Sequence, residues 1–347
     1  MKRRISSLLL AAAILAALPA SADEPAERVR ESVSAERVVV DVRVIDNQGA
    51  PVTGLGVSDF FLRVDGRPVS IESVEWISSG APGAASAARE PAGTSPGEPT
   101  APPAGRLVVL FFQTDFEPSR ITGQMRMIRQ ALSFLDTCSP EDRLAVLSFD
   151  SRLKLRQDFT SDRGKLRRAI VRTLYADNSP DPPAGSFPSL ASSLDFRAAR
   201  KASLPEHALR IIGQGLAALP GSKSLLFFGW GIGNFDSMMG LILDHNYALA
   251  RAALLRSHTS VFVLDVTTAD FHSMEGGLEA IAGDTGGLYV KTHVFPQFAM
   301  QKVARAISGE YVLSFVRPPL ERGRHEMSIR VPGHRWAAVL ARPDYVD

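Results

Sequence analysis

The sequence predicts an α/β protein with a doubly wound, mostly parallel sheet, flanked by N- and C-terminal β segments that form a small β module. The first observation is an apolar run over residues 107–112 that ends at a polar cluster over residues 113–117, typical of a parallel strand buried on both faces. The second is the alternation of strand-like and helix-like segments from residue 106 to residue 308, which indicates a parallel sheet covered by helices. The third is period-two polarity in the flanking segments, 36–79 and 309–347, which indicates further β structure.

Residues 1–22 have the pattern of a signal peptide. Basic residues at positions 2–4 precede a mostly apolar stretch over residues 5–18, and a small-x-small cleavage site ends at Ala22. The apolar stretch is short for a membrane span, and an uncleaved N-terminal anchor is the alternative. We therefore expect a secreted or periplasmic protein with no membrane segment after the signal is removed.

The composition argues against some classes of function. The 347-residue chain has 39 Lys and Arg against 37 Asp and Glu, and three of the basic residues belong to the predicted signal. The remaining chain is near neutral, so it lacks the basic balance of a nucleic-acid-binding protein, and no nucleic-acid partner is expected. Cys138 is the only cysteine, which excludes an intramolecular disulfide.

Strand and turn signals place β structure at both ends of the chain. In the N-terminal module, residues 36–79, the dipeptide Asp65-Gly66 is typical of a tight hairpin turn. Residues 80–105 are mostly Ala, Pro, Gly and Ser, so we expect a disordered linker. The C-terminal segment 309–347 has strand-like stretches at 311–316, 326–331 and 336–340. Since neither end can bury a core alone, we expect them to pack as one β-sandwich-like module into which the α/β domain is inserted.

Periodicity assigns the elements of the α/β domain, residues 106–308. Ser119 is a candidate N-cap of the first helix, and residues 176–203 form a long insertion rich in Pro and Ser. We expect strands at 107–112, 144–149, 153–159, 223–228, 259–266 and 287–291, with 153–159 at an edge. We expect helices at 119–137, 162–174, 204–219, 237–257, 274–283 and 296–307.

Several of these segments resemble a von Willebrand factor A domain, most of all the secreted bacterial type called the acidobacterial VWFA-related family. They are the strand 107–112 with its polar exit, LAVLSFDSRLKLRQDFTSD (144–162), KSLLFFGWG (223–231) and AGDTGGLY (282–289). The stretches VVVDVRVIDNQGAPVTGL (38–55) and YVLSFVRPP (311–319) are similar to the β segments that precede and follow the domain in that family. The resemblance covers roughly residues 36–79 and 106–347 and implies a von Willebrand A, Rossmann-like fold.

The resemblance also implies a metal-ion-dependent adhesion site, built from Asp-x-Ser-x-Ser after the first strand, a Thr in a later loop and an Asp after the fourth strand. Here the motif falls on Gln113, Asp115 and Glu117, so its leading carboxylate is an amide and its hydroxyls are carboxylates. The fourth-strand position falls on Trp230-Gly231. The loop that should carry the Thr corresponds to 176–203, which contains none; the nearest substitutes are Ser189, Ser192 and Ser193.

These departures predict a degenerate site without a resident cofactor. Mg²⁺ prefers octahedral oxygen ligands with one or two carboxylates, and Trp230 offers no oxygen. Asp115 and Glu117 could still bind Ca²⁺ or Mg²⁺ weakly. Alternatively, they are solvated carboxylates at the start of a helix, where negative charge is favourable.

Patterns of catalytic residues are weak, and no catalytic residue is expected. Residues 229–234 resemble a phosphate-binding loop superficially, but Asn234 stands where a dinucleotide fingerprint has its third Gly. The seven His residues show no zinc spacing, and no nucleophile elbow is present. Asp265, at the end of a strand-like run, is either a candidate acid or the cap of a turn.

We expect an exported, non-enzymatic, metal-independent interaction module, for adhesion or scaffolding, with an unidentified protein partner. Aromatic residues at a rim favour protein contacts, although Trp230 could equally fill the emptied metal pocket. One alternative is a cation-dependent adhesion domain using Asp115 and Glu117, and another is a hydrolase using the crevice near Asp265. The predicted partner-binding rim consists of Gln113, Asp115, Phe116, Glu117, Trp230, Asn234 and Phe235.

Overall fold

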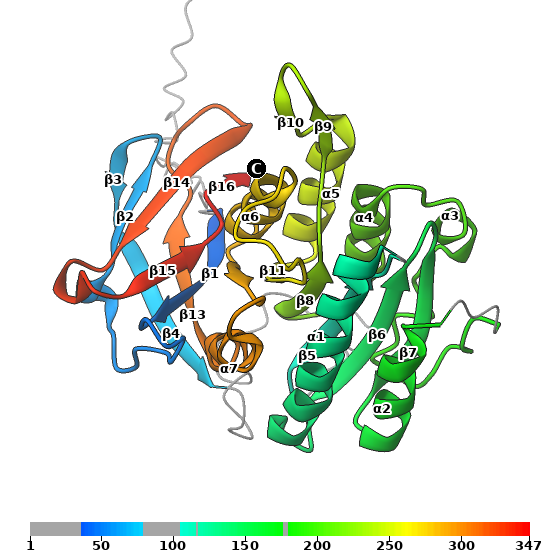
Figure 1. Cartoon of the computed structure of the whole chain (residues 1–347). Coiled ribbons are helices and arrows are strands. Elements are labelled where there is room, and N and C mark those ends of the chain that lie inside the picture. Colours follow the sequence, from blue (N-terminus) through cyan, green and yellow to red (C-terminus); the bar gives the residue numbers. More distant parts are fainter. Residues whose placement is uncertain (1–35, 79–104, 116, 176–179) are drawn as a thin grey trace, which may run out of the picture. The chain divides into compact units, whose positions relative to one another are not determined.

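A six-stranded sheet forms the centre of the α/β domain. The computed structural model describes residues 36–78, 105–115, 117–175 and 180–347. The strands lie in the order β12-β11-β8-β5-β6-β7, and all are parallel except β7, which pairs antiparallel with β6 at one edge (Figure 1). When the strands are numbered from 1 at β5 along the chain and read from β7 to β12, their order is the doubly wound 3-2-1-4-5-6. The switch point of this order lies between β5 and β8. The bounds are β5 Leu107–Gln113, β6 Arg143–Phe149, β7 Leu153–Thr160, β8 Lys223–Gly229, β11 Thr259–Asp265 and β12 Leu288–Lys291.

Helices cover both faces of this sheet. Side chains of α1, α2 and α7 pack against one face, where the rings of Phe112 and Phe228 stack with centroids 4.4 Å apart. Side chains of α4, α5 and α6 pack against the other face, where Phe111 and Phe227 stack at 5.1 Å. Successive strand residues point to opposite faces, so the fully apolar β5 fills both cores, and the predicted fold class is confirmed. The bounds are α1 Pro118–Thr137, α2 Arg163–Arg172, α3 Phe196–Ala199, α4 Pro205–Leu216, α5 His245–Arg256, α6 Glu275–Asp284 and α7 Pro296–Ala306.

The flanking β segments form two four-stranded sheets around one core, as the predicted small β module requires. One sheet has the order β15-β1-β13-β4 and the other β16-β14-β2-β3. β1 pairs antiparallel with β13, with Val42 opposite Tyr311, and the shared core includes Val42, Leu62, Tyr311 and Phe315. The bounds are β1 Arg37–Ile45, β2 Phe61–Val64, β3 Arg67–Val69, β4 Ile71–Ser78, β13 Gly309–Val316, β14 Arg324–Arg330, β15 Ala338–Ala341 and β16 Asp344–Val346.

The predicted helix over residues 237–257 is wrong in its first third. A two-stranded hairpin of β9 (Asn234–Asp236) and β10 (Gly240–Ile242) stands there, and α5 begins only at His245. The carboxylate of Asp236 accepts hydrogen bonds from the N–H groups of Met238 and Met239 at 2.7 and 2.9 Å. Gly240 has a φ of +78°, which favours glycine and ends a helix. Asp244 then caps α5 by accepting from two N–H groups of its first turn.

Smaller departures concern element ends. The N-cap of α1 is Glu117 and not Ser119, because the Glu117 side chain accepts from the N–H of Arg120 and Pro118 begins the helix. The last strand, β16, was not predicted; it pairs with β14 at the edge of the second sheet. The insertion after α2 contains the short helix α3, and two single-turn 3₁₀ helices occupy Val57–Asp59 and Pro332–His334.

A buried ion pair lies where the β module meets the α/β domain. Arg43 of β1 is 4% exposed, and its guanidinium lies 2.5 Å from the carboxylate of Glu310 in β13. Arg43 also donates to the hydroxyl of Ser260 in β11 at 3.0 Å, and Ser222, just before β8, donates to Glu310. The pair therefore ties β1 and β13 of the module to β11 and to the residue that precedes β8 in the central sheet.

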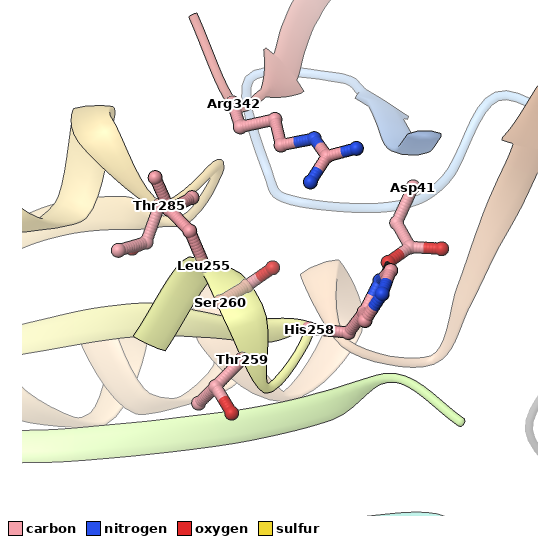
Figure 2. A pocket seen from close by; sticks show the side chains of 7 residues that line it. All are labelled: Asp41, Leu255, His258, Thr259, Ser260, Thr285 and Arg342. Carbon is pink, nitrogen blue, oxygen red and sulfur yellow. Dashed lines mark ion pairs between the residues drawn. The ribbon is translucent and has the colours of Figure 1, made fainter. Parts of the chain in front are cut away.

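A small cavity lies at the same junction (Figure 2). Its volume is about 20 Å³, enough for one water molecule. Asp41 and Arg342 line it from the module, while His258 and Ser260 line it from the α/β domain. The carboxylate of Asp41 lies 3.5 Å from Nδ1 of His258. Consistent with these contacts, the described residues between 36 and 347 form one compact unit.

Cutting the chain between β4 and β5 should leave the two pieces bound to each other. β4 pairs with β13 from Ile71 opposite Phe315 to Ser78 opposite Gly309, so the piece 36–79 shares a sheet with the C-terminal segment. Strands that share a sheet and a core separate only when that core unfolds. Limited proteolysis within 80–105, followed by size-exclusion chromatography without denaturant, should show both pieces in one peak. Release of a free 36–79 piece would contradict the single-module interpretation.

Three predictions concern segments outside the described residues. These are the signal ending at Ala22, the linker over 80–105 apart from its last residue, and the contribution of Phe116 to the rim. Among the described residues, no helix combines the length and the apolar character that crossing a membrane requires.

Candidate functional site

The side chain of Gln113 joins two loops at the switch point of the sheet. Its Oε1 accepts hydrogen bonds from the N–H groups of Trp230 at 2.9 Å and Gly231 at 3.2 Å, and its Nε2 donates to the carbonyl of Gly231 at 3.1 Å. Its backbone carbonyl accepts from Nε2 of Gln124 in α1. Gln113 is only 2% exposed, so its assignment to a partner-binding rim is wrong. An amide suits this position because it donates and accepts at once, whereas a carboxylate only accepts.

Arg120 supplies a positive charge beside this loop. It forms an ion pair with Asp115, and its guanidinium carbon lies 3.6 Å from the centroid of the Trp230 ring. Such a cation–π contact is favourable over the face of a tryptophan. The Trp230 ring also packs against the core beneath α1. This packing favours the alternative in which Trp230 fills the emptied metal pocket over the one in which Trp230 contacts a partner.

The carboxylates of Asp115 and Glu117 shape the start of α1. Asp115 accepts from the N–H of Glu117 at 3.1 Å, and Glu117 accepts from the N–H of Arg120 at 3.2 Å. Both interactions bring a carboxylate oxygen to an N–H group at the helix start, as capping side chains do. In the part of the chain that the structure describes, no three His, Cys, Asp or Glu side chains are grouped to hold a metal ion.

The serines that stand in for the missing Thr form hydrogen bonds elsewhere. Ser189 donates to the buried carboxylate of Asp158 at 2.6 Å, and Ser193 donates to the carbonyl of Gly215 at 2.8 Å. Ser192 donates to the carbonyl of Ser189 at 2.8 Å. These bonds organise the insertion between α2 and α4, and none of them runs to the loop after β5.

Asp265 is a buried carboxylate with both oxygens hydrogen-bonded. One oxygen accepts from the hydroxyl of Tyr289 at 2.7 Å and lies 2.8 Å from Nε2 of His272, and the other accepts from the N–H of Thr267 at 2.9 Å. Burial raises the pKa of Asp265, but the hydrogen bonds from His272, Thr267 and Tyr289 outweigh it and hold the pKa below its ordinary value. This arrangement fits the turn-capping alternative better than the role of a general acid.

Many exposed apolar side chains belong to segments on the carboxyl-edge side of the sheet. The loops after β5, β6, β8, β11 and β12 share this edge because parallel strands end together. Two contacts connect α1 with the loops after β12 and β11: Arg126 of α1 donates to the carbonyl of His293 at 2.8 Å, and Nε2 of His293 lies 2.8 Å from Asp270. Of the seventeen exposed large apolar side chains among the described residues, nine lie here. We call them the carboxyl-edge surface: Met125, Tyr175, Phe235, Met238, Met239, Phe271, Val294, Phe295 and Phe298.

The β9–β10 hairpin and the start of α7 carry most of this surface. Met238 and Met239 at the hairpin turn are 94% and 73% exposed, and Figure 1 shows the hairpin extending beyond α5. Phe295 and Phe298 lie edge to face with centroids 6.0 Å apart. Two residues of the predicted rim, Asn234 and Phe235, are exposed on β9.

The sequence analysis missed the phenylalanines at the start of α7. A signal was present, because Ala299, Met300, Val303 and Ala306 recur at helical spacing and form the buried set of this helix, which leaves Phe298 and the N-cap Phe295 outside it. Aromatic residues left outside the buried set of an amphipathic helix favour a contact surface. The contact of Arg120 with Trp230 had no such signal, because these two residues become adjacent only when β5 and β8 pair.

Together, these features define a doubly wound α/β domain inserted into a β-sandwich-like module, with an apolar surface at the carboxyl edge of its sheet. No protein-family model matches this chain, and no curated protein matches it.

Among solved structures, the chain is similar to a von Willebrand factor type A protein from Catenulispora acidiphila, with 9% identity and a TM-score of 0.41 over 89% of this chain and 73% of that one. It is similar to the conserved hypothetical protein BatB from Bacteroides thetaiotaomicron, with 12% identity and a TM-score of 0.40 over 59% of this chain and 98% of that one. It is also similar to the PilB minor pilin from Streptococcus sanguinis, with 13% identity and a TM-score of 0.35, and covers 60% of that chain with 58% of its own length. Scores this low carry no functional argument, and the fold class rests on the strand order and packing.

Proposed function

We propose that this protein is an exported, non-enzymatic module that binds a protein partner through its carboxyl-edge surface. The observation that carries the proposal is that nine of the seventeen exposed large apolar side chains among the described residues belong to segments that follow the carboxyl ends of the strands or adjoin them. Phe, Tyr and Met are enriched at protein interfaces, and seven of the nine side chains are Phe or Tyr or belong to the Met238-Met239 turn. The hairpin that carries Asn234 and Phe235, both in the predicted rim, supplies part of this surface.

We propose further that this binding needs no divalent cation. Asp115 already pairs with Arg120, and Arg120 lies over Trp230, so a metal ion would have to displace a guanidinium from both neighbours. Mg²⁺ also requires a near-octahedral set of oxygen ligands. Cation-dependent adhesion through Asp115 and Glu117 is therefore the weaker alternative.

Site-specific photocrosslinking tests the partner surface. We expect p-benzoylphenylalanine placed at Phe298 or at Met238 to crosslink the same protein from extracts of the cell envelope and growth medium of the source organism. The matched control is Phe61 in β2, which is 41% exposed but lies in the β module, and no crosslink to that protein is expected from it. Crosslink yields should be equal in Mg²⁺ and in EDTA.

Two outcomes would count against the proposal. Crosslinking from Phe61 at the same yield as from Phe298 would show that the capture is not specific to the carboxyl-edge surface. Loss of the crosslink in EDTA, with recovery in Ca²⁺ or Mg²⁺, would favour the cation-dependent alternative.

A further inference from the structure

All the exposed methionines of the described residues belong to the carboxyl-edge surface. Met238 and Met239 at the hairpin turn are 94% and 73% exposed, and Met125 of α1 is 58% exposed. The other described methionines are shielded, three of them in hydrophobic cores at 0%, 4% and 5% exposure and one partly buried: Met127, Met300, Met327 and Met274. The thioethers that an oxidant in solution can reach therefore lie on the surface proposed to bind the partner.

The backbone of the β9–β10 turn, and not its methionine side chains, holds the turn together. The carboxylate of Asp236 accepts from the N–H groups of Met238 and Met239, and Asp236 pairs with Gly240 where the two strands meet. Side chains that are 94% and 73% exposed contribute little packing to the hairpin, which extends beyond α5 in Figure 1. A chemical change at their sulfur atoms therefore alters the surface and leaves the fold intact.

We propose that the Met238-Met239 turn is an oxidation site through which a peroxide weakens partner binding. The inference rests on the proposed function and names a regulation of its surface. A lone pair of the thioether sulfur attacks one oxygen of hydrogen peroxide, an S–O bond forms, the O–O bond breaks, and water leaves after a proton shift. The sulfur is oxidised by two electrons and the peroxide is reduced. The product, methionine sulfoxide, is polar where the thioether was apolar.

This change acts directly on the contact with the partner. A partner surface that is complementary to an apolar thioether provides no donor for the sulfoxide oxygen, and burying a polar group without a hydrogen bond is unfavourable. We expect partner binding to weaken about tenfold. Outside the cytosol the chain is also separated from the thiol systems that keep cytosolic proteins reduced.

Cys138 is the only thiol of the chain and competes poorly for the oxidant. Its side chain is partly buried, and its Sγ donates to the carbonyl of Phe134 at 3.4 Å. Burial raises the pKa of the Cys138 thiol to about 11, so very little of the reactive thiolate is present at neutral pH. An effect of peroxide on binding is therefore expected from the exposed methionines.

The test treats the purified full chain with hydrogen peroxide and removes the peroxide before any extract is added. Peptide mapping by mass spectrometry should show Met238 and Met239 converted to sulfoxide while the three core methionines stay reduced. Photocrosslinking from p-benzoylphenylalanine at Phe298 then reports binding, and its yield at limiting protein concentration should fall about tenfold. Treatment with methionine sulfoxide reductases A and B should restore the yield.

Two variants locate the effect, and each is compared with its own untreated sample. Met238→Leu/Met239→Leu keeps the turn apolar but removes both reactive sulfur atoms, so peroxide should not change its crosslink yield. Met125→Leu is the matched control, because it removes the other exposed thioether and keeps the turn, and its yield should still fall about tenfold. The urea midpoint of the treated, unaltered chain should stay the same, since the modified side chains are exposed.

The other results contradict the inference. Oxidation of the core methionines as fast as Met238 and Met239 would show that the turn is not a selective site. An unchanged crosslink yield after both sulfoxides have formed would refute the inference and leave the proposed function standing. An equal loss of yield in Met238→Leu/Met239→Leu would place the effect elsewhere. Absence of any crosslink from the untreated chain would instead refute the proposed function, and this inference with it.

Discussion

Replacing Arg43 by methionine should lower the free energy of unfolding by about 3–5 kcal/mol, the range measured when one partner of a buried ion pair is removed. Glu310 is 7% exposed and would keep only the donor on Ser222. The loss should be large because the uncompensated carboxylate stays buried at the junction of two sheets. Urea unfolding followed by tryptophan fluorescence measures it.

The pH dependence and a double variant check the cause of this loss. Burial raises the pKa of Glu310, and Arg43 opposes the rise, so removing Arg43 raises this pKa further. A carboxyl group whose pKa is higher in the folded state contributes stability below its unfolded pKa and loses it as the pH rises. The defect of Arg43→Met should therefore be largest at neutral pH and shrink as the pH falls toward 4.5, the ordinary value. Arg43→Met/Glu310→Leu should recover most of the stability, and a double variant as unstable as the single one would contradict this explanation.

Replacing Gln113 by leucine should cost about 3 kcal/mol or more of unfolding free energy. The leucine nearly preserves the volume but leaves two N–H groups, of Trp230 and Gly231, and one carbonyl without their side-chain partner, and each buried unsatisfied group costs about 1–3 kcal/mol. The loop that carries Trp230 should also loosen, which changes the tryptophan emission under native conditions. Thermal or urea unfolding gives the stability, and fluorescence gives the local effect.

Gln157→Leu is the matched control for this variant. Gln157 lies on β7, is only partly buried, and donates to the adjacent Asp158 carbonyl at 3.1 Å. Its replacement should cost less than about 1 kcal/mol, as expected for a side chain outside a buried network. Similar losses for Gln113→Leu and Gln157→Leu would mean that the bonds of Gln113 do not hold the switch point together.

The sequence predicted the central sheet well because its strands carry strong local signals. Short apolar runs such as residues 107–112 and 225–228 are typical of strands in a sheet covered on both faces. The hairpin over 234–242 was missed because a few specific interactions override an apolar, helix-compatible sequence. The hydrogen bonds that Asp236 accepts and the positive φ of Gly240 form a turn here. Hydrophobic periodicity does not detect such a turn.

The candidate site was harder to predict because its contacts join distant parts of the chain. The resemblance placed Gln113 and Trp230 at the same site, but the bonds that bury Gln113 depend on the pairing of β5 with β8. The ion pair of Asp115 with Arg120 is local, yet the stacking of Arg120 on Trp230 again needs that pairing. The charge and chemical type of each site residue could therefore be read from the sequence, but its burial could not.

The β module cannot be completed until the end of the chain has been made. β1 pairs with β13 and β15, so the first described strand has its sheet neighbours only in the C-terminal segment. Long-range pairing of this kind is slow, because loop closure costs entropy before any contact is gained. Folding of the inserted domain removes most of that cost, since Arg106 at its start donates to the carbonyl of Ile307 at its end at 3.3 Å. A substitution that slows folding of the inserted domain would therefore prolong the time during which the edges of β1 are unpaired. Such a substitution would favour aggregation even though it lies outside the β module.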